Sequence, residues 1–129
     1  MLSQMVPLTE GLLYPGESDE PVHFFCKDYP DSSGSFGPEQ FRQLFGIDQN
    51  ISILTRDPFH FWTAVTTHHS WYDDSARERV ERFITIREIL DSTLENIKYF
   101  EVGNREVSLY YLGFHNQCIH GLQTMVVRT

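Results

Sequence analysis

Histidine side chains are the first candidates for chemistry in this sequence. His68 and His69 are adjacent and lie close to Asp73 and Asp74, while the other histidines are scattered along the chain. Adjacent histidines do not converge on one metal ion, and the chain has no His-x-x-x-His or His-Glu-x-x-His spacing. We therefore expect solvent-exposed loop histidines, no metal of the chain's own and no cofactor.

The two cysteines, Cys26 and Cys118, both lie in apolar, strand-like segments. We expect buried, reduced thiols, as is usual in an intracellular chain. Two cysteines alone make neither a zinc site nor a disulfide framework. A Cys–His nucleophile is an alternative that no spacing favours, and the sequence has no glycine-rich phosphate loop and no Gly-x-Ser-x-Gly motif. A small enzyme that uses the histidines therefore ranks below a binding protein.

Two segments have the composition of a binding surface. The first is a turn-rich segment with three carboxylates, Glu17, Asp19 and Glu20. The second is the pair Trp71 and Tyr72, large aromatic residues of the kind that anchor protein interfaces, in a loop before a long helix. An ordinary solvated surface is the alternative interpretation of both segments.

Arg87 is the exception in the longest predicted helix because it lies near the centre of an otherwise apolar stripe. Asp91 follows four residues later, which places it one helical turn away. We expect an ion pair that covers the sheet edge, with the aliphatic part of Arg87 packed against apolar side chains. A ligand site is the alternative.

The longest predicted helix runs from about residue 73 to about residue 97. Asp73, Asp74 and Ser75 are typical of a helix N-cap and first turn. Apolar side chains then recur at about 100° per residue and form one broad stripe. They are Ala76, Val80, Phe83, Ile84, Ile86, Leu90 and Leu94.

Shorter helices are predicted at residues 38–45 and 59–65. Each follows or begins with a proline, and Gly46 ends the first of them. Pro7 interrupts any helix within residues 1–9. Residues 11–21 contain several turn-forming residues and predict a loop.

Apolar and alternating segments predict strands at residues 22–28, 51–55, 98–102, 105–114 and 118–128. Gly103-Asn104 is typical of a two-residue hairpin turn, and residues 115–117 form the next turn. Leu122, Thr124 and Val126 alternate along the last strand. The elements predict an α+β fold in one domain, residues 1–129, with helices on a mostly antiparallel sheet of four or five strands.

The chain of 129 residues is acidic, with a formal net charge of -8. Residues 1–64 carry nine acids and three basic residues, a net charge of -6, and residues 65–129 carry nine and seven, a net charge of -2. Binding to nucleic acid needs an excess of Lys and Arg, so we do not expect nucleic acid as a direct ligand. The charge suits a partner with a basic surface.

The sequence also bears on location. No apolar run approaches the length of a membrane span. The N-terminus lacks the basic residues and the long apolar stretch of a secretory signal. We therefore expect a cytoplasmic protein that does not bind membranes, and a monomer.

Three segments form a recognisable combination in their order and spacing. Residues 11–18 read Gly-Leu-Leu-Tyr-Pro-Gly-Glu-Ser and are followed by Pro21. Residues 64–74 contain a Thr-Thr pair followed by Trp-Tyr and two acids, and residues 126–129 read Val-Val-Arg-Thr. From about Thr9 onward the chain resembles the nuclease A inhibitor family, proteins that block sugar-non-specific nucleases.

The resemblance implies an α/β/α sandwich with a central antiparallel sheet. It also implies a non-enzymatic inhibitor of a magnesium-dependent nuclease that cleaves DNA and RNA. By position, the terminal carboxylate of Thr129 would ligate the nuclease's catalytic magnesium, Glu17 would point into the same active site, and Trp71 would pack on the nuclease. Magnesium prefers oxygen ligands, and a rigid carboxylate imitates a phosphate without offering a bond to cut.

Several positions depart from the family's pattern, among them Pro7, which falls where the family's first helix continues. Ser70 stands where the family has an acid before the tryptophan, Arg128 where it has an acid near the end, and Arg87 where it has an apolar helix residue. We place Ser70 at the partner-binding surface with Glu17, Trp71 and Thr129. The departures leave open that the chain inhibits a different nuclease or has lost inhibition. A non-enzymatic adaptor that uses the fold for another protein partner is the alternative.

Overall fold

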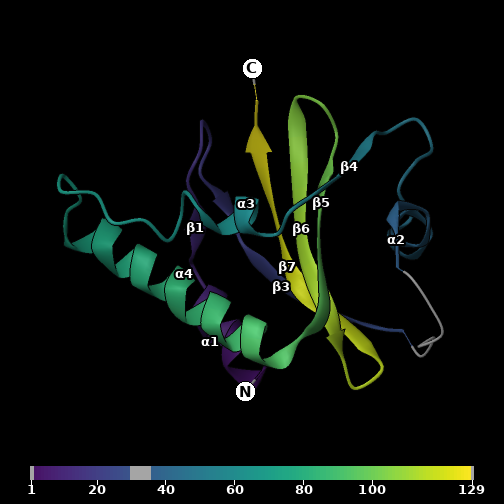
Figure 1. Cartoon of the computed structure of the whole chain (residues 1–129). Coiled ribbons are helices and arrows are strands. Elements are labelled where there is room, and N and C mark those ends of the chain that lie inside the picture. The colour runs from purple at the N-terminus through teal and green to yellow at the C-terminus, as the bar shows by residue number, and fades with distance from the viewer. Residues whose placement is uncertain (1, 30–35, 129) are drawn as a thin grey trace.

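An antiparallel sheet forms the centre of the molecule (Figure 1). The computed structural model describes residues 2–29 and 36–128. Within them, the strands of the sheet are β3 (His23–Asp28), β4 (Ile53–Arg56), β5 (Glu95–Val102), β6 (Glu106–His115) and β7 (Cys118–Val127). The five strands are ordered β3-β7-β6-β5-β4, and each pair is antiparallel. A small separate hairpin consists of β1 (Leu13–Tyr14) and β2 (Glu20–Pro21).

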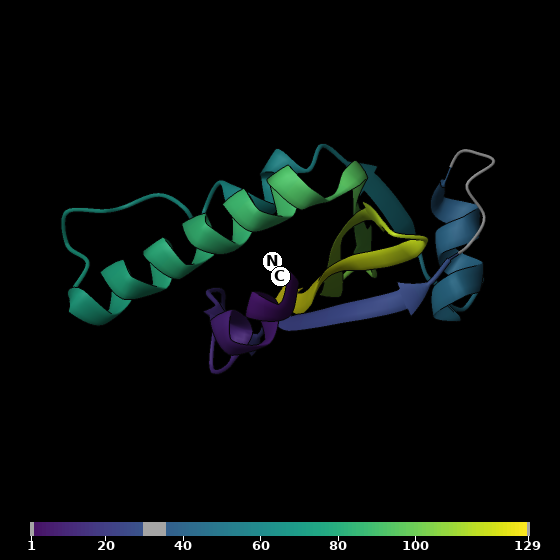
Figure 2. The ribbon, with the colours of Figure 1, turned by 90° about the horizontal axis from the view of Figure 1, so that it is seen from below.

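Helices pack against both faces of the sheet (Figure 2). They are the 3-10 helix η1 (Leu2–Gln4) and the α-helices α1 (Met5–Thr9), α2 (Pro38–Phe45), α3 (Phe59–Trp62) and α4 (Asp74–Thr93). Side chains of α1, α3 and α4 share one core, and those of α2 share another on the opposite face. This arrangement confirms the predicted α+β fold with an α/β/α sandwich and one long helix. None of the helices in the described ranges is long and apolar enough to span a membrane.

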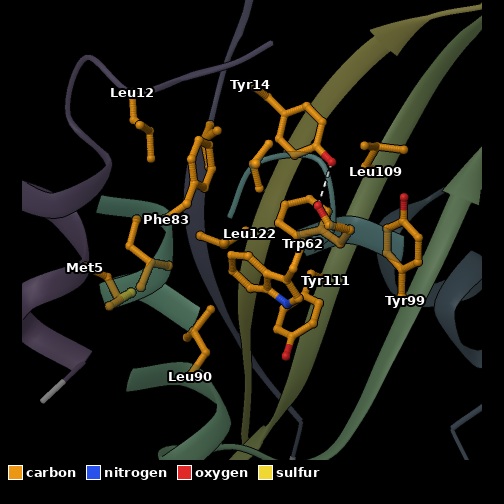
Figure 3. Close-up of a cluster of buried hydrophobic side chains, with 14 of the residues drawn as sticks. Met5, Leu12, Tyr14, Trp62, Phe83, Leu90, Tyr99, Leu109, Tyr111 and Leu122 are labelled. Atoms are coloured by element: carbon orange, nitrogen blue, oxygen red, sulfur yellow. Dashed lines mark hydrogen bonds between the residues drawn. The ribbon is translucent and has the colours of Figure 1, made fainter. Parts of the chain in front are cut away.

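The larger core lies between the sheet and α4 (Figure 3). Side chains alternate across a strand, so Leu109 and Tyr111 of β6 point to the same side, where both are buried. Phe83 of α4 meets Tyr14 edge-on, with 6.0 Å between the ring centroids. The Tyr14 hydroxyl donates a hydrogen bond of 2.6 Å to the carbonyl of Phe61 and thereby ties β1 to α3.

The second core is aromatic and joins α2 to the other face of the sheet. The ring of Phe41 stacks on that of Phe100, with 4.3 Å between centroids and 14° between planes. Tyr110 meets Phe41 edge-on at 5.0 Å. The predicted boundaries of α2 are confirmed, and Gly46 ends the helix in the left-handed region with φ of 65°.

The long helix begins as predicted and ends earlier. The Asp73 carboxylate accepts a hydrogen bond of 2.8 Å from the backbone N–H of Ala76, which caps the helix. The helix ends at Thr93 rather than near residue 97, because the following residues join β5. A Cβ placed on Gly113 of β6 would lie 2.7 Å from Cβ of Leu94. Glycine is therefore needed at this point of β6, where the chain leaves α4. Asn96, in the left-handed region with φ of 52°, lies at the register shift between Glu95 and Lys98 at the start of β5.

The two predicted hairpin turns differ in outcome. Strand β5 ends at Val102 and β6 begins at Glu106, so the three residues 103–105 connect them, and the predicted two-residue turn at Gly103-Asn104 is wrong. Neighbouring strands hold this longer loop, since the N–H of Gly103 donates to the Ser52 carbonyl at 3.0 Å. The β6–β7 turn lies within the predicted residues 115–117 but is one residue shorter, because His115 pairs with Cys118. It consists of Asn116 and Gln117, with φ of 50° and 61°.

Three short segments also differ from expectation. Helix α1 contains Pro7, which is tolerated because it lies in the first turn, where N–H groups have no helical partner. Helix α3 ends at Trp62 instead of residue 65, although the N–H of Thr66 still bonds to the Trp62 carbonyl at 3.0 Å. The predicted loop at residues 11–21 contains the β1–β2 hairpin.

Candidate partner-binding site

The loop that carries Glu17 lies beside the C-terminal end of β7. The hydroxyl of Thr124 donates a hydrogen bond of 3.0 Å to the carbonyl of Pro21 and joins the β1–β2 hairpin to β7. A Cβ placed on Gly16 would lie 4.0 Å from Cγ1 of Val126. In Figure 1 the tip of this hairpin and the C-terminal end of β7 both lie at the top of the molecule. The structure therefore brings the loop with the exposed Glu17 beside the C-terminal end of β7.

Arg128 is fixed at the end of β7 by its backbone and by its side chain. Its N–H donates to the Arg105 carbonyl at 2.8 Å. Its guanidinium donates to both carboxylate oxygens of Glu101, at 2.8 and 3.0 Å. Glu101 is only 3% exposed and also accepts a hydrogen bond of 2.7 Å from the hydroxyl of Tyr99. A second cation, Arg56, lies 3.5 Å from the same carboxylate.

The charges around Glu101 stabilise its ionised form. Burial alone raises the pKa of this carboxyl, but hydrogen bonds from Arg128 and Tyr99 and the charges of Arg128 and Arg56 hold the pKa below its usual 4.5. Burial and the neighbouring carboxylate raise the pKa of the Tyr99 hydroxyl, which therefore remains a donor. Because the Arg128 guanidinium is paired with Glu101, its positive charge is compensated within the fold.

Thr129, the predicted magnesium ligand, lies outside the described residues. The last described residue is Arg128, and its backbone and side-chain contacts are therefore what the structure shows at the end of β7. What the structure provides is a fixed point one residue away from the predicted ligand.

Ser70 and Trp71 lie in a separate loop at the other end of the molecule. Trp71 is 75% exposed, and its indole stacks on the His69 ring with 4.5 Å between centroids and 20° between planes. Tyr72 meets the same imidazole edge-on at 4.9 Å, and Ser70 is exposed. In Figures 1 and 2 this loop lies at the N-terminal end of α4, away from the C-terminal end of β7. The structure therefore does not bring Ser70 and Trp71 into one patch with Glu17.

Comparison with known protein families yields a match over the full length of the chain. Residues 1–129 match the family described as nuclease A inhibitor-like protein. The chain belongs to this family. The match confirms the family inferred from the three segments, and with it the prediction of a non-enzymatic inhibitor family rather than an enzyme. No curated protein matches the sequence significantly.

Arg87 of this inhibitor-like chain forms the ion pair with Asp91 that the sequence predicts. Its Nε lies 3.4 Å from the Asp91 carboxylate, and its guanidinium lies over the Trp62 ring at 5.9 Å from the centroid. The hydroxyl of Tyr111 donates a hydrogen bond of 2.5 Å to the other oxygen of Asp91. These contacts confirm an ion pair packed on aromatic side chains.

The histidines and cysteines of this inhibitor-like chain include a group that the sequence analysis missed. Cys26 is exposed and Cys118 half-buried, so the predicted buried thiols are wrong, because Cys26 lies in the exposed half of the edge strand β3. His120 lies in β7 rather than in a loop. One ligand atom of each of these three residues lies within 4.8 Å of the other two. The signal was present as Cys-x-Asp and Cys-x-His, which alternation places on one strand face, but the pairing of the two strands could not be deduced.

Proposed function

We propose that this chain inhibits a magnesium-dependent, non-specific nuclease by placing the carboxylate of Thr129 on the nuclease's catalytic metal. The family match over residues 1–129 supports the class of partner. The observation that carries the mechanism is the fixed end of β7, where Arg105 and Glu101 hold Arg128 one residue before Thr129.

The chemistry of such a tip suits a nuclease active site. Mg²⁺ favours oxygen ligands, so a carboxylate takes the place of a phosphate oxygen or a water molecule. It carries negative charge into a cleft built for phosphate, and it has no phosphodiester bond to cleave. An anchored strand end also loses little conformational entropy on binding, which favours affinity.

Glu17 supplies a second carboxylate from the neighbouring hairpin in this proposal. Its loop packs against the end of β7 through Gly16 and Val126, so the two carboxylates approach the nuclease from the same edge. The formal net charge of -8 accelerates the encounter with a basic cleft through long-range attraction.

Ser70 and Trp71 form a second contact region in this proposal. Phe83 packs against Tyr14 of the hairpin, and the nine helical steps from Asp74 to Phe83 span about 14 Å. An ordinary interface buries about 800 Å² on each partner, which is wide enough to cover both regions. One chain carries every group that the proposal needs, so we propose a monomeric inhibitor, acting in the cytoplasm.

The proposal is tested by adding the purified chain to a panel of magnesium-dependent non-specific nucleases. We expect cleavage of DNA and of RNA by at least one of them to stop at a one-to-one ratio of the two proteins. A metal-independent ribonuclease serves as the control and should be unaffected. A gel-shift assay with the same nucleic acids should show no binding, since capture of the substrate would also reduce cleavage.

Failure of the folded chain to inhibit any of these nucleases would contradict the proposal. Stable, stoichiometric binding to a protein that is not a nuclease would instead support the adaptor alternative.

A further inference from the structure

Four side chains with metal-binding atoms occupy one face of two paired strands. Cys26 and Asp28 are two residues apart in β3, and Cys118 and His120 are two residues apart in β7. Side chains two residues apart in a strand point to the same face. The strand register places Cys26 opposite His120 and Asp28 opposite Cys118, so the four positions form a square.

The distances among three members of this square are close to those of a metal site. The ligand atoms of Cys26, Cys118 and His120 all lie within 4.8 Å of one another. The thiol of Cys118 lies 3.5 Å from Oδ1 of Asp28. Tetrahedral zinc, with bonds of about 2.3 Å to sulfur and about 2.0 Å to nitrogen, separates its ligand atoms by roughly 3.5 Å. For Cys26, Cys118 and His120, side-chain rotations that close a gap of about 1 Å are therefore sufficient.

The histidine of the group is held in place and has an unused nitrogen. Its ring stacks on Phe24, with 6.1 Å between centroids and 17° between planes. Nδ1 of His120 is buried and makes no hydrogen bond to any part of the chain that the structure describes. Buried polar atoms normally have a partner, so this histidine is a candidate to receive a ligand. Cys26 is exposed, which gives an ion access from solvent.

We propose that Cys26, Cys118 and His120 bind one zinc ion, with Asp28 as the fourth ligand. Two thiolates and an imidazole select zinc over magnesium or calcium, which prefer oxygen donors. The carboxylate of Asp28 completes a tetrahedral set and is already next to Cys118.

The proposed zinc site is separate from the proposed nuclease-binding tip. It lies at the start of β7, whereas Arg128 follows the end of that strand, so the two are at opposite ends of β7 (Figure 1). Ten residues of antiparallel strand span about 34 Å. Zinc therefore ties the edge strand β3 to β7 and stabilises the fold without contacting the nuclease partner.

The test is a titration of the reduced, full-length chain with Zn²⁺. Calorimetry measures the stoichiometry and affinity of binding, and thermal denaturation measures the melting temperature. We expect one zinc per chain and a melting temperature that rises with zinc concentration. Co²⁺ in place of zinc should give a near-ultraviolet thiolate-to-cobalt absorption band and the visible bands of a tetrahedral ion.

Matched variants assign the ligands. Cys118→Ser and His120→Ala should each weaken zinc binding by about 100-fold or more, because loss of outer contacts to a metal ligand already costs about 10- to 100-fold. His68→Ala, an exposed histidine of the loop before α4, is the control and should bind zinc as the wild type does.

The wild type also provides a measurement that does not depend on variants. Zinc should protect both cysteines from alkylation in the reduced protein, even if a variant fails to fold without metal. Alkylation that proceeds equally fast with and without saturating zinc would overturn the proposal. Unchanged zinc affinity in a folded Cys118→Ser variant, or a tetrahedral cobalt spectrum that persists in it, would also overturn it.

Discussion

At the scale of single residues, the buried carboxylate of Glu101 determines how the end of β7 is held. It accepts hydrogen bonds from Arg128 and Tyr99, and it is 3% exposed. A buried charge is tolerated when its hydrogen-bonding capacity is satisfied, and it becomes costly when one partner is removed. Glu101 thereby links the stability of the fold to the position of the proposed inhibitory tip.

Replacement of Arg128 by alanine should lower the free energy of unfolding by about 1–3 kcal/mol, because it leaves part of a buried carboxylate unsatisfied. Urea denaturation measures this effect. Arg77→Ala is a matched control, since Arg77 pairs with the exposed Asp74 and such pairs contribute less than about 1 kcal/mol. Equal losses in both variants would contradict the role given to Glu101.

The ionisation of Glu101 should make stability depend on pH. Its pKa is below 4.5 in the folded protein, so its stabilisation is complete above pH 4.5 and is lost as the pH falls through the lower folded-state pKa. We expect Glu101→Gln to be less stable than the wild type near pH 7, with a difference that shrinks in acid. Urea denaturation from pH 7 to pH 3 checks this, with Glu106→Gln at an exposed site as control. A difference that stays constant with pH would argue against an ionised Glu101.

Some site residues could be identified from residue type, and others depend on long-range pairing. The exposed aromatic Trp71 and the loop carboxylate Glu17 were named from the sequence, because such residues stand out in loops. The partnership of Glu101 with Arg128 was not foreseen, since it requires β5 and β7 to lie on either side of β6. The grouping of Cys26 with His120 was missed for the same reason, as strand register is not visible in local patterns.

At the scale of elements, the close packing of β6 and β7 depends on Gly121. A Cβ at this position would lie 2.1 Å from the carbonyl oxygen of Tyr111 and 2.8 Å from Cα of Leu112. These are backbone atoms within the sheet, so they cannot move aside without disturbing the strand ladder. The sheet centre thus tolerates only glycine at this point.

Gly121→Ala should therefore destabilise the protein by about 3 kcal/mol, the upper part of the usual range for overpacking. Thermal or urea denaturation measures the loss. Gly16→Ala provides the comparison, because the nearest atom to its Cβ would be 3.8 Å away, and we expect a change within about 0.5 kcal/mol. A Gly121→Ala variant as stable as the wild type would show that the strands can separate easily.

The elements themselves were predicted best where local signals agree. Helix α2 has Pro38 at its start and Gly46 after its end, and both boundaries were correct. The end of α4 was placed about four residues late, because its apolar periodicity continues into residues that instead pair with β6. The β5–β6 loop was misjudged because its hydrogen bonds with Ser52, just before β4, and with Arg128 override its local Gly-Asn signal.

At the scale of the whole molecule, the proposed nuclease-binding groups lie in two regions joined by a rigid frame. The hairpin with Glu17 and the end of β7 form one region, and the loop with Trp71 at the start of α4 forms the other. Helix α4 packs on the sheet through Phe83 and Leu90 and fixes the spacing between them. A partner that contacts both regions must match this spacing, which is a source of specificity.

Trp71→Ala should weaken nuclease binding by about 2 kcal/mol, or about 30-fold in Kd, if the indole is an interface anchor. Its melting temperature should not change, because Trp71 is 75% exposed. Calorimetric titration against an inhibited nuclease gives the affinity. Val6→Ala, an exposed apolar residue in α1, should leave the affinity unchanged. Wild-type affinity in Trp71→Ala would remove this loop from the interface.

The most direct test of the central claim is the inhibition constant of a chain that lacks Thr129, compared with that of Thr129→Ala. Deletion moves the terminal carboxylate back by one residue, whereas the alanine variant keeps it in place and changes only the side chain. We predict that the deletion weakens inhibition by orders of magnitude, that Thr129→Ala inhibits nearly as well as the wild type, and that both variants melt at the wild-type temperature. Equal inhibition by the shortened chain would contradict metal ligation by the terminal carboxylate.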